Sequence, residues 1–160
     1  MTQNNLFIKR DRMRYTKDSF SSGMVLLAIV FNVLYFVSIY QSDVERYYYD
    51  WVIGASVIYN LLFLLIAFLA SQGVKNRKDG FVLTLLVIGA LQIVRIFYLP
   101  ANASAALQEN GDPVMGAGQH IYVVICLAVS AVCCIVAAVS NFITNKQLAQ
   151  HMRELQKQSA

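Results

Sequence analysis

The sequence predicts an all-α, polytopic membrane protein, a four-transmembrane-helix bundle with a cytoplasmic C-terminal helical extension. Its 160 residues are 58% hydrophobic and only 14% charged, whereas a soluble domain is nearer half apolar and a quarter charged. The apolar excess falls in four blocks, each close to the ~20 residues that a helix needs to cross a bilayer. The blocks lack the apolar–polar alternation of β-barrel strands. We expect spans at about 22–40, 51–71, 81–99 and 121–143.

Basic residues predict the orientation and the division of the chain. Positions 1–18 carry five, the connection between the second and third spans three, and positions 144–160 three, whereas the connections on the other side carry only Arg46. By the positive-inside rule both termini lie in the cytoplasm of a cell-membrane protein. We therefore expect a basic N-terminal tail (1–18), a transmembrane domain (19–143) and an amphipathic cytoplasmic tail (144–160). The net charge of +4 reflects this topology and attraction to anionic lipid, not a nucleic-acid partner.

The first two spans each contain one asparagine at mid-membrane depth. Asp18 precedes the first span, where a carboxylate favours the positive end of the helix dipole. Asn32 and Asn60 are expected to hydrogen-bond to other helices, although a ligand or ion role is the alternative. Trp51 opens the second span at interfacial depth, and Gly73 is expected to cap its C-terminal end.

The third span carries Gln92 and Arg95 on one side and is expected to end at Pro100, which cannot continue a helix comfortably. An arginine at the centre of a span costs roughly 2.5–3.5 kcal/mol. Because Arg95 lies near the outer end of its span, its side chain can extend to the headgroups. One interpretation is therefore structural, with the arginine extended to the headgroups or paired within the chain. The candidate partners are the outer carboxylates Asp43, Glu45, Asp50 and Asp112.

The other interpretation of Arg95 is functional. It makes Arg95, Gln92, Asn32 and Asn60 a polar intramembrane site for an anion, a lipid headgroup or a partner's carboxylate. No span carries an acidic residue, which tells against a proton- or cation-coupled transporter, because such proteins usually place a carboxylate in their pathway. The absence of acidic residues does not exclude a pathway for anions that uses Arg95.

The fourth span carries small residues at every fourth position, and such stripes let helix backbones approach closely. No glycine or proline follows Ile121, so the helix can continue into the tail, where Leu148, Met152 and Leu155 form an apolar stripe. That stripe can dock on this chain, on a lipid surface or on a partner. The small-residue stripe of the span consists of Cys126, Ser130, Cys134 and Ala138.

The sequence offers no recognisable catalytic constellation, so we expect no enzyme, no metal and no cofactor. No CxxC, no phosphate-binding loop and no zinc-protease motif occurs. The leading hypothesis is an integral membrane accessory or scaffold protein that associates with the lipid bilayer and with other membrane subunits or itself. The alternative is a small dimeric transporter or channel for an anionic or neutral solute that uses Arg95 and Gln92.

Overall fold

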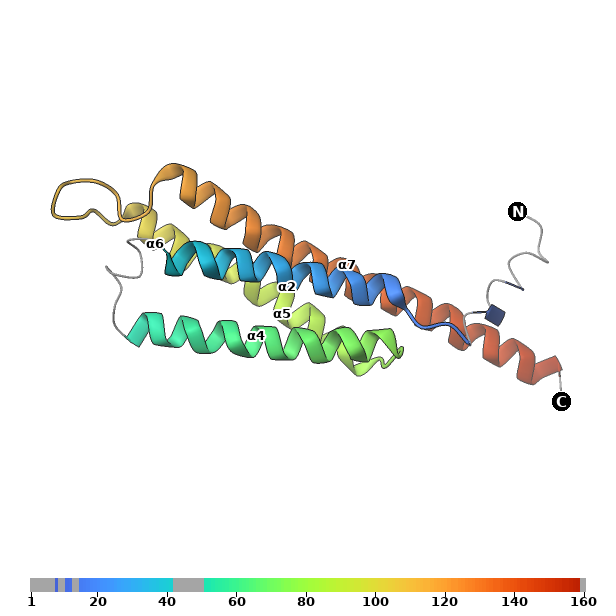
Figure 1. Ribbon diagram of the computed structural model, residues 1–160. Helices are drawn as coiled ribbons and strands as arrows, with labels where there is room; N and C mark the ends of the chain where they lie inside the picture. Colours follow the sequence, from blue (N-terminus) through green and yellow to red (C-terminus); the bar gives the residue numbers. More distant parts are fainter. Residues whose placement is uncertain (1–7, 9–10, 13–14, 42–50, 159–160) are drawn as a thin grey trace.

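The computed structural model describes residues 8, 11–12, 15–41 and 51–158, and its elements are helices (Figure 1). The predicted all-α class is confirmed. Four helical segments in the described residues are long and apolar enough to cross a membrane, as predicted. The helices are α2 (Ser19–Tyr40), α4 (Trp51–Lys75), α5 (Gly80–Ile96), α6 (Leu99–Ala105) and α7 (Ala117–Gln158).

The long helices form a bundle in which α2 packs between α4 and α7. Helix α5 packs closely against α7 and more lightly against α4. Large apolar side chains on all four long helices face outward, as Leu61 and Leu65 do on α4. Helix α7 extends beyond its neighbours at the end where α2 begins (Figure 1). We call this the Asp18 end and the opposite end, where α6 lies, the α6 end.

Asp18 joins three helices at the Asp18 end. Its carboxylate caps α2 by accepting hydrogen bonds from the backbone N–H of Ser21 (3.0 Å) and from the Ser21 hydroxyl (2.7 Å). Asn141 of α7 donates to the same carboxylate (2.9 Å) and to the carbonyl of Val74 in α4 (3.0 Å). Burial would raise the pKa of Asp18, but these hydrogen bonds and the charge of Arg77 outweigh it, so the pKa lies below its ordinary value of 3.8.

Gly73 does not end the second span, which corrects the expectation from sequence. Helix α4 continues to Lys75, and the left-handed conformation that closes the turn falls on Arg77, with φ of 57°. The reason for a glycine at position 73 is steric. A Cβ atom there would collide with the ring of Phe81, which packs against the helix at this point.

Pro100 stands at the start of a new helix. Helix α5 ends at Ile96, and Pro100 falls in the first turn of α6, where its missing N–H leaves no hydrogen bond unmade. The connection after α6 folds back on the bundle, because Met115 donates its N–H to the carbonyl of Ala103 (3.1 Å). Val114 and Met115 are buried, so this connection covers the α6 end of the bundle.

The small-residue stripe of α7 faces the inside of the bundle, where its four members are at most 2% exposed. A Cβ atom on Gly89 of α5 would lie 3.3 Å from the Cβ of Cys134 and 3.4 Å from the carbonyl oxygen of Ala131. The stripe therefore allows α5 to approach α7 closely within the chain, and it does not offer a face to a second protein.

The extension of α7 contacts the N-terminal segment. His151 is fully buried, and its Nε2 lies 3.6 Å from a carboxylate oxygen of Asp11. Met152 remains 37% exposed, and Leu148 and Leu155 are half-buried. The apolar stripe of the tail is therefore only partly covered.

Candidate functional site

A layer of polar side chains divides the buried core in two. An apolar cluster on the Asp18 side includes Ala28, Phe63, Ile88 and Cys134, and a second cluster lies on the α6 side. The polar layer between them consists of Asn32, Asn60, Gln92 and Ser130, each at most 1% exposed, together with the half-buried Arg95. It draws one or two side chains from each long helix.

Neutral amides connect the layer. Gln92 donates from Nε2 to Oδ1 of Asn32 (2.8 Å) and to the hydroxyl of Ser130 (3.3 Å). Ser130 donates in turn to the carbonyl of Ala28 (3.0 Å). Asn32 donates to Oδ1 of Asn60 (3.3 Å), whose own amide donates to a carbonyl of α4. These bonds satisfy polar groups that would be costly to bury without partners.

Arg95 enters this layer and does not extend to the end of its helix as one interpretation of the sequence predicted. Its Nη1 donates to Oδ1 of Asn32 (3.1 Å) and to Oε1 of Gln92 (3.0 Å). Its Nη2 donates to Oδ1 of Asn60 (3.0 Å). The four residues that the sequence predicted as a polar intramembrane site therefore lie together, with Asn32 as the acceptor shared by Gln92 and Arg95.

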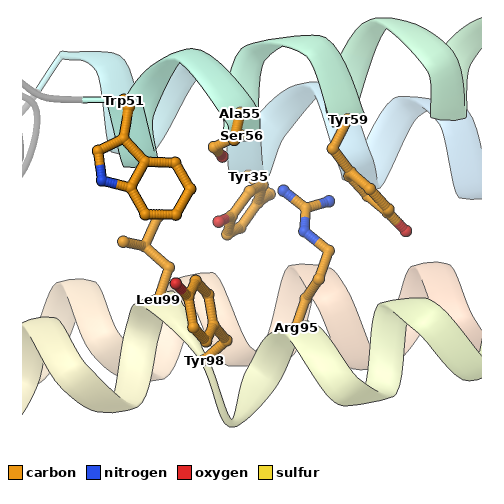
Figure 2. Close-up of a pocket in the computed structure, with 8 residues that line it drawn as sticks. All are labelled: Tyr35, Trp51, Ala55, Ser56, Tyr59, Arg95, Tyr98 and Leu99. Atoms are coloured by element: carbon orange, nitrogen blue, oxygen red, sulfur yellow. The ribbon is translucent and has the colours of Figure 1, made fainter.

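Two tyrosine rings enclose the guanidinium. Its central carbon lies 4.5 Å from the ring centroid of Tyr35 and 4.4 Å from that of Tyr59. Aromatic faces attract cations at this distance. Figure 2 shows Arg95 reaching from α5 between the two rings. This arrangement holds the side chain in one place and shields part of its charge from its surroundings.

Among the described residues, no carboxylate accepts a hydrogen bond from Arg95. Its acceptors there are three amide oxygens. Of the four carboxylates considered as partners, Asp43, Glu45 and Asp50 lie outside the described residues. Asp112 bonds with Asn110 instead, so it is not the partner. The arginine is hydrogen-bonded, but its positive charge is not balanced by a described side chain.

A pocket of about 270 Å³ lies beside Arg95, on the α6 side of the polar layer. It exists because the buried apolar cluster on that side includes α2, α6 and α7 but no described side chain of α4. The start of α4 therefore stands away from α5 and leaves a space that Trp51 and Tyr98 flank from opposite sides (Figure 2). The residues that line the pocket are Tyr35, Trp51, Ala55, Ser56, Tyr59, Arg95, Tyr98 and Leu99.

The pocket wall carries hydrogen-bond donors that the protein leaves unused. A guanidinium has five N–H groups, and the bonds of Arg95 account for three of them. In the described part of the chain, the hydrogen bonds of Arg95 use neither its Nε–H nor its second Nη2–H. The hydroxyl of Tyr35 is also buried without a partner, although the side chain is only 1% exposed. Unpaired buried polar groups of this kind are rare and require an explanation.

Sequence reasoning missed the aromatic half of the site. Tyr35 lies three residues from Asn32, so helical spacing places the two side chains on one face. Tyr59 directly precedes Asn60, and such neighbours point in different directions, so only the structure places its ring against Arg95. Ser130 was predicted only as a packing residue, yet it also anchors Gln92.

The described residues contain no group of three His, Cys, Asp or Glu side chains that can hold a metal ion. Comparisons of the chain with families of proteins, with curated proteins and with solved structures found no match.

Proposed function

We propose that this chain is a multi-pass membrane protein that binds an anionic ligand at Arg95 without catalysing a reaction. One observation carries the proposal. A guanidinium held by neutral amides, with no described carboxylate near it, faces a pocket and keeps two N–H groups unused. An anion in the pocket would balance the charge and accept those hydrogen bonds.

Membrane insertion is supported by the outward-facing apolar side chains of the four long helices. Large exposed apolar surfaces of this kind are unfavourable in water and are typical of lipid-facing helices. In the described part of the chain, basic residues gather at the Asp18 end, where Lys17, Lys75, Arg77, Lys78 and Lys146 lie. The positive-inside rule assigns that end to the cytoplasm, together with both termini of a cell-membrane protein. The Arg95 pocket then lies in the outer half of the bilayer.

Binding is better supported than conduction. On the Asp18 side of the polar layer, apolar side chains from all four long helices fill the bundle, Phe63 and Leu85 among them. Ser22 and Ser71 bond to each other at 2.9 Å near that end and are themselves buried. A solute in the pocket would therefore meet a closed layer of amides and then a packed core.

Quenching of Trp51 tests the proposal directly, because this is the single tryptophan of the chain and it lines the pocket. Iodide, an anionic quencher, should quench Trp51 more effectively relative to neutral acrylamide in the wild type than in Arg95→Gln. The substitution keeps a polar side chain but removes the charge. If the ratio of the iodide quenching constant to the acrylamide quenching constant is the same in both proteins, anion binding at Arg95 is contradicted. Arg153→Gln, on the exposed part of the tail, is the matched control and should leave the ratio unchanged.

Association with another membrane subunit, or with a second copy of the chain, is the second candidate function. The partly exposed stripe of the α7 extension, with Met152 at its centre, favours it. The small-residue stripe no longer does, because the bundle buries it. Replacing Met152 by glutamate should release a co-purifying subunit in mild detergent, and a wild-type protein that purifies as a monomer would contradict this function.

A further inference from the structure

We infer that the anion bound at Arg95 is the head of a monoanionic amphiphile, a carboxylate or phosphodiester group attached to an apolar tail. The inference rests on the proposed function and names the class of its ligand. It follows from three properties of the pocket: the single charge at its inner end, the arrangement of unused donors, and the apolar side chains that lead out of it.

The charge of the ligand follows from the charge of the site. Among the described residues that line the pocket, Arg95 is the one cationic side chain, and its neighbours in the layer are neutral. A monoanion would cancel that charge. A dianion such as a phosphate monoester would leave one negative charge uncompensated in a medium of low dielectric constant, which is strongly unfavourable.

The donors fit the head of an oxyacid. The unused N–H groups of Arg95 and the hydroxyl of Tyr35 come from two different helices, and both side chains line the same pocket. Figure 2 shows the Tyr35 hydroxyl directed away from Arg95, toward the end of the pocket that Trp51 and Tyr98 flank. Carboxylate and phosphodiester groups each offer two oxygens that accept such bonds.

The remaining wall fits an apolar tail. Trp51, Ala55, Tyr98 and Leu99 surround the space beyond the donors, and Trp51 and Tyr98 are 79% and 55% exposed, so the pocket opens outward between α4 and α5. The pocket has a volume of about 270 Å³, which is too small to enclose a long acyl chain. The head and the first few carbons would fill it, and a longer tail would continue along the apolar outer surface of the helices.

Brominated probes in phosphatidylcholine nanodiscs test this inference, because bromine on an acyl chain quenches Trp51 on contact. The first pair is dibromostearate and its methyl ester, and the second is dibromo-phosphatidylglycerol and dibromo-phosphatidylcholine. We expect the monoanionic member of at least one pair to quench more than its partner, in a saturable manner. Excess quenching by the fatty acid alone identifies a free carboxylate as the source. Excess quenching by phosphatidylglycerol alone identifies a phosphodiester lipid.

Three variants test whether the excess quenching of Trp51 arises from binding in the Arg95 pocket. Arg95→Gln should abolish the excess quenching, Tyr35→Phe should shift its midpoint to higher probe concentration, and Arg153→Gln should leave it unchanged. Because Tyr35→Phe removes one oxygen and preserves the ring, it keeps the test valid if Arg95→Gln fails to fold. Equal quenching within both pairs, or an excess that persists in Arg95→Gln, would overturn the inference. If the iodide effect on Trp51 nevertheless depends on Arg95, anion binding stands and only the amphiphile is rejected.

Discussion

Oδ1 of Asn32 lies 3.1 Å from Nη1 of Arg95, so a neutral amide faces the arginine where a carboxylate would be expected. A carboxylate would have neutralised the charge, so that the site would no longer attract an anion. The amide holds the guanidinium in place and leaves its charge available. This relationship, together with the pocket beside it, is the basis of the functional account.

Asn32 should contribute more to stability than Asn60. Asn32 accepts from Gln92 and Arg95 and donates to Asn60, whereas one of the bonds of Asn60 stays within its own helix. We expect Asn32→Leu to lower the free energy of unfolding by about 1–3 kcal/mol and Asn60→Leu by less, because Asn32 bonds to three side chains of the layer and Asn60 to two. Unfolding in detergent, followed by circular dichroism, measures both. The reverse order would contradict the central role of Asn32.

Lysine should not replace Arg95. The planar guanidinium reaches three amide oxygens at once and stacks between Tyr35 and Tyr59, which an ammonium group cannot do. Arg95→Lys should lower thermal stability despite preserving the charge. It should also weaken iodide quenching of Trp51. Wild-type stability and quenching in Arg95→Lys would show that only the charge matters.

Gly89 should tolerate a side chain poorly. A Cβ there would meet Cys134 and Ala131 of α7 at 3.3–3.4 Å, so Gly89→Val should destabilise the bundle by about 1–3 kcal/mol through overpacking. Gly54→Val is the matched control, since nothing lies within 4 Å of a Cβ at that helical position. Thermal unfolding of the two variants side by side makes the comparison. Equal effects would contradict a close contact between α5 and α7.

The Asp18 cap should contribute stability only while its carboxyl is ionised. Because its pKa is lowered in the folded state, the contribution is complete above the unfolded pKa of about 3.9. It disappears as the pH falls through the lower folded value. The stability difference between the wild type and Asp18→Asn should therefore stay constant at neutral pH and narrow below pH 3.8. Denaturant titrations across pH 2–7 measure it, and a difference that grows at low pH would refute the assignment.

Both ends of the chain should lie on the cytoplasmic side. In a background without Cys126, Cys133 and Cys134, a cysteine at Gly111 should react with an impermeant maleimide on intact cells. A cysteine at Gln150, which is exposed on the α7 extension, should react only after permeabilisation. The opposite pattern would invert the topology and place the Arg95 pocket in the inner half of the membrane.

The sequence predicted the helices well because long apolar blocks have few alternative structures. It also grouped Asn32, Asn60, Gln92 and Arg95 as one candidate site, because polar side chains within apolar spans are expected to point at other helices and because Gln92 and Arg95 lie three residues apart on one side of their helix. It could not decide whether Arg95 points outward or inward. That choice depends on α2 and α4, two helices distant in sequence that each supply an amide oxygen and an aromatic ring to the guanidinium.

The pocket was beyond sequence reasoning for a similar reason. It arises because α4 takes no part in the apolar cluster on the α6 side, and the hydropathy of Trp51–Lys75 does not reveal where a helix separates from its neighbour. The steric role of Gly73 could not be predicted from sequence either. Its neighbour, the ring of Phe81, comes from the following helix, whereas local sequence suggested a helix cap.

Native mass spectrometry of the protein extracted from its own membrane in mild detergent tests the central claim most directly. The wild type should retain a small anionic compound, and Arg95→Gln, prepared in parallel and folded by circular dichroism, should lack it. If the wild type and Arg95→Gln carry the same bound species, or the wild type carries none, Arg95 does not hold an anion and the account is wrong.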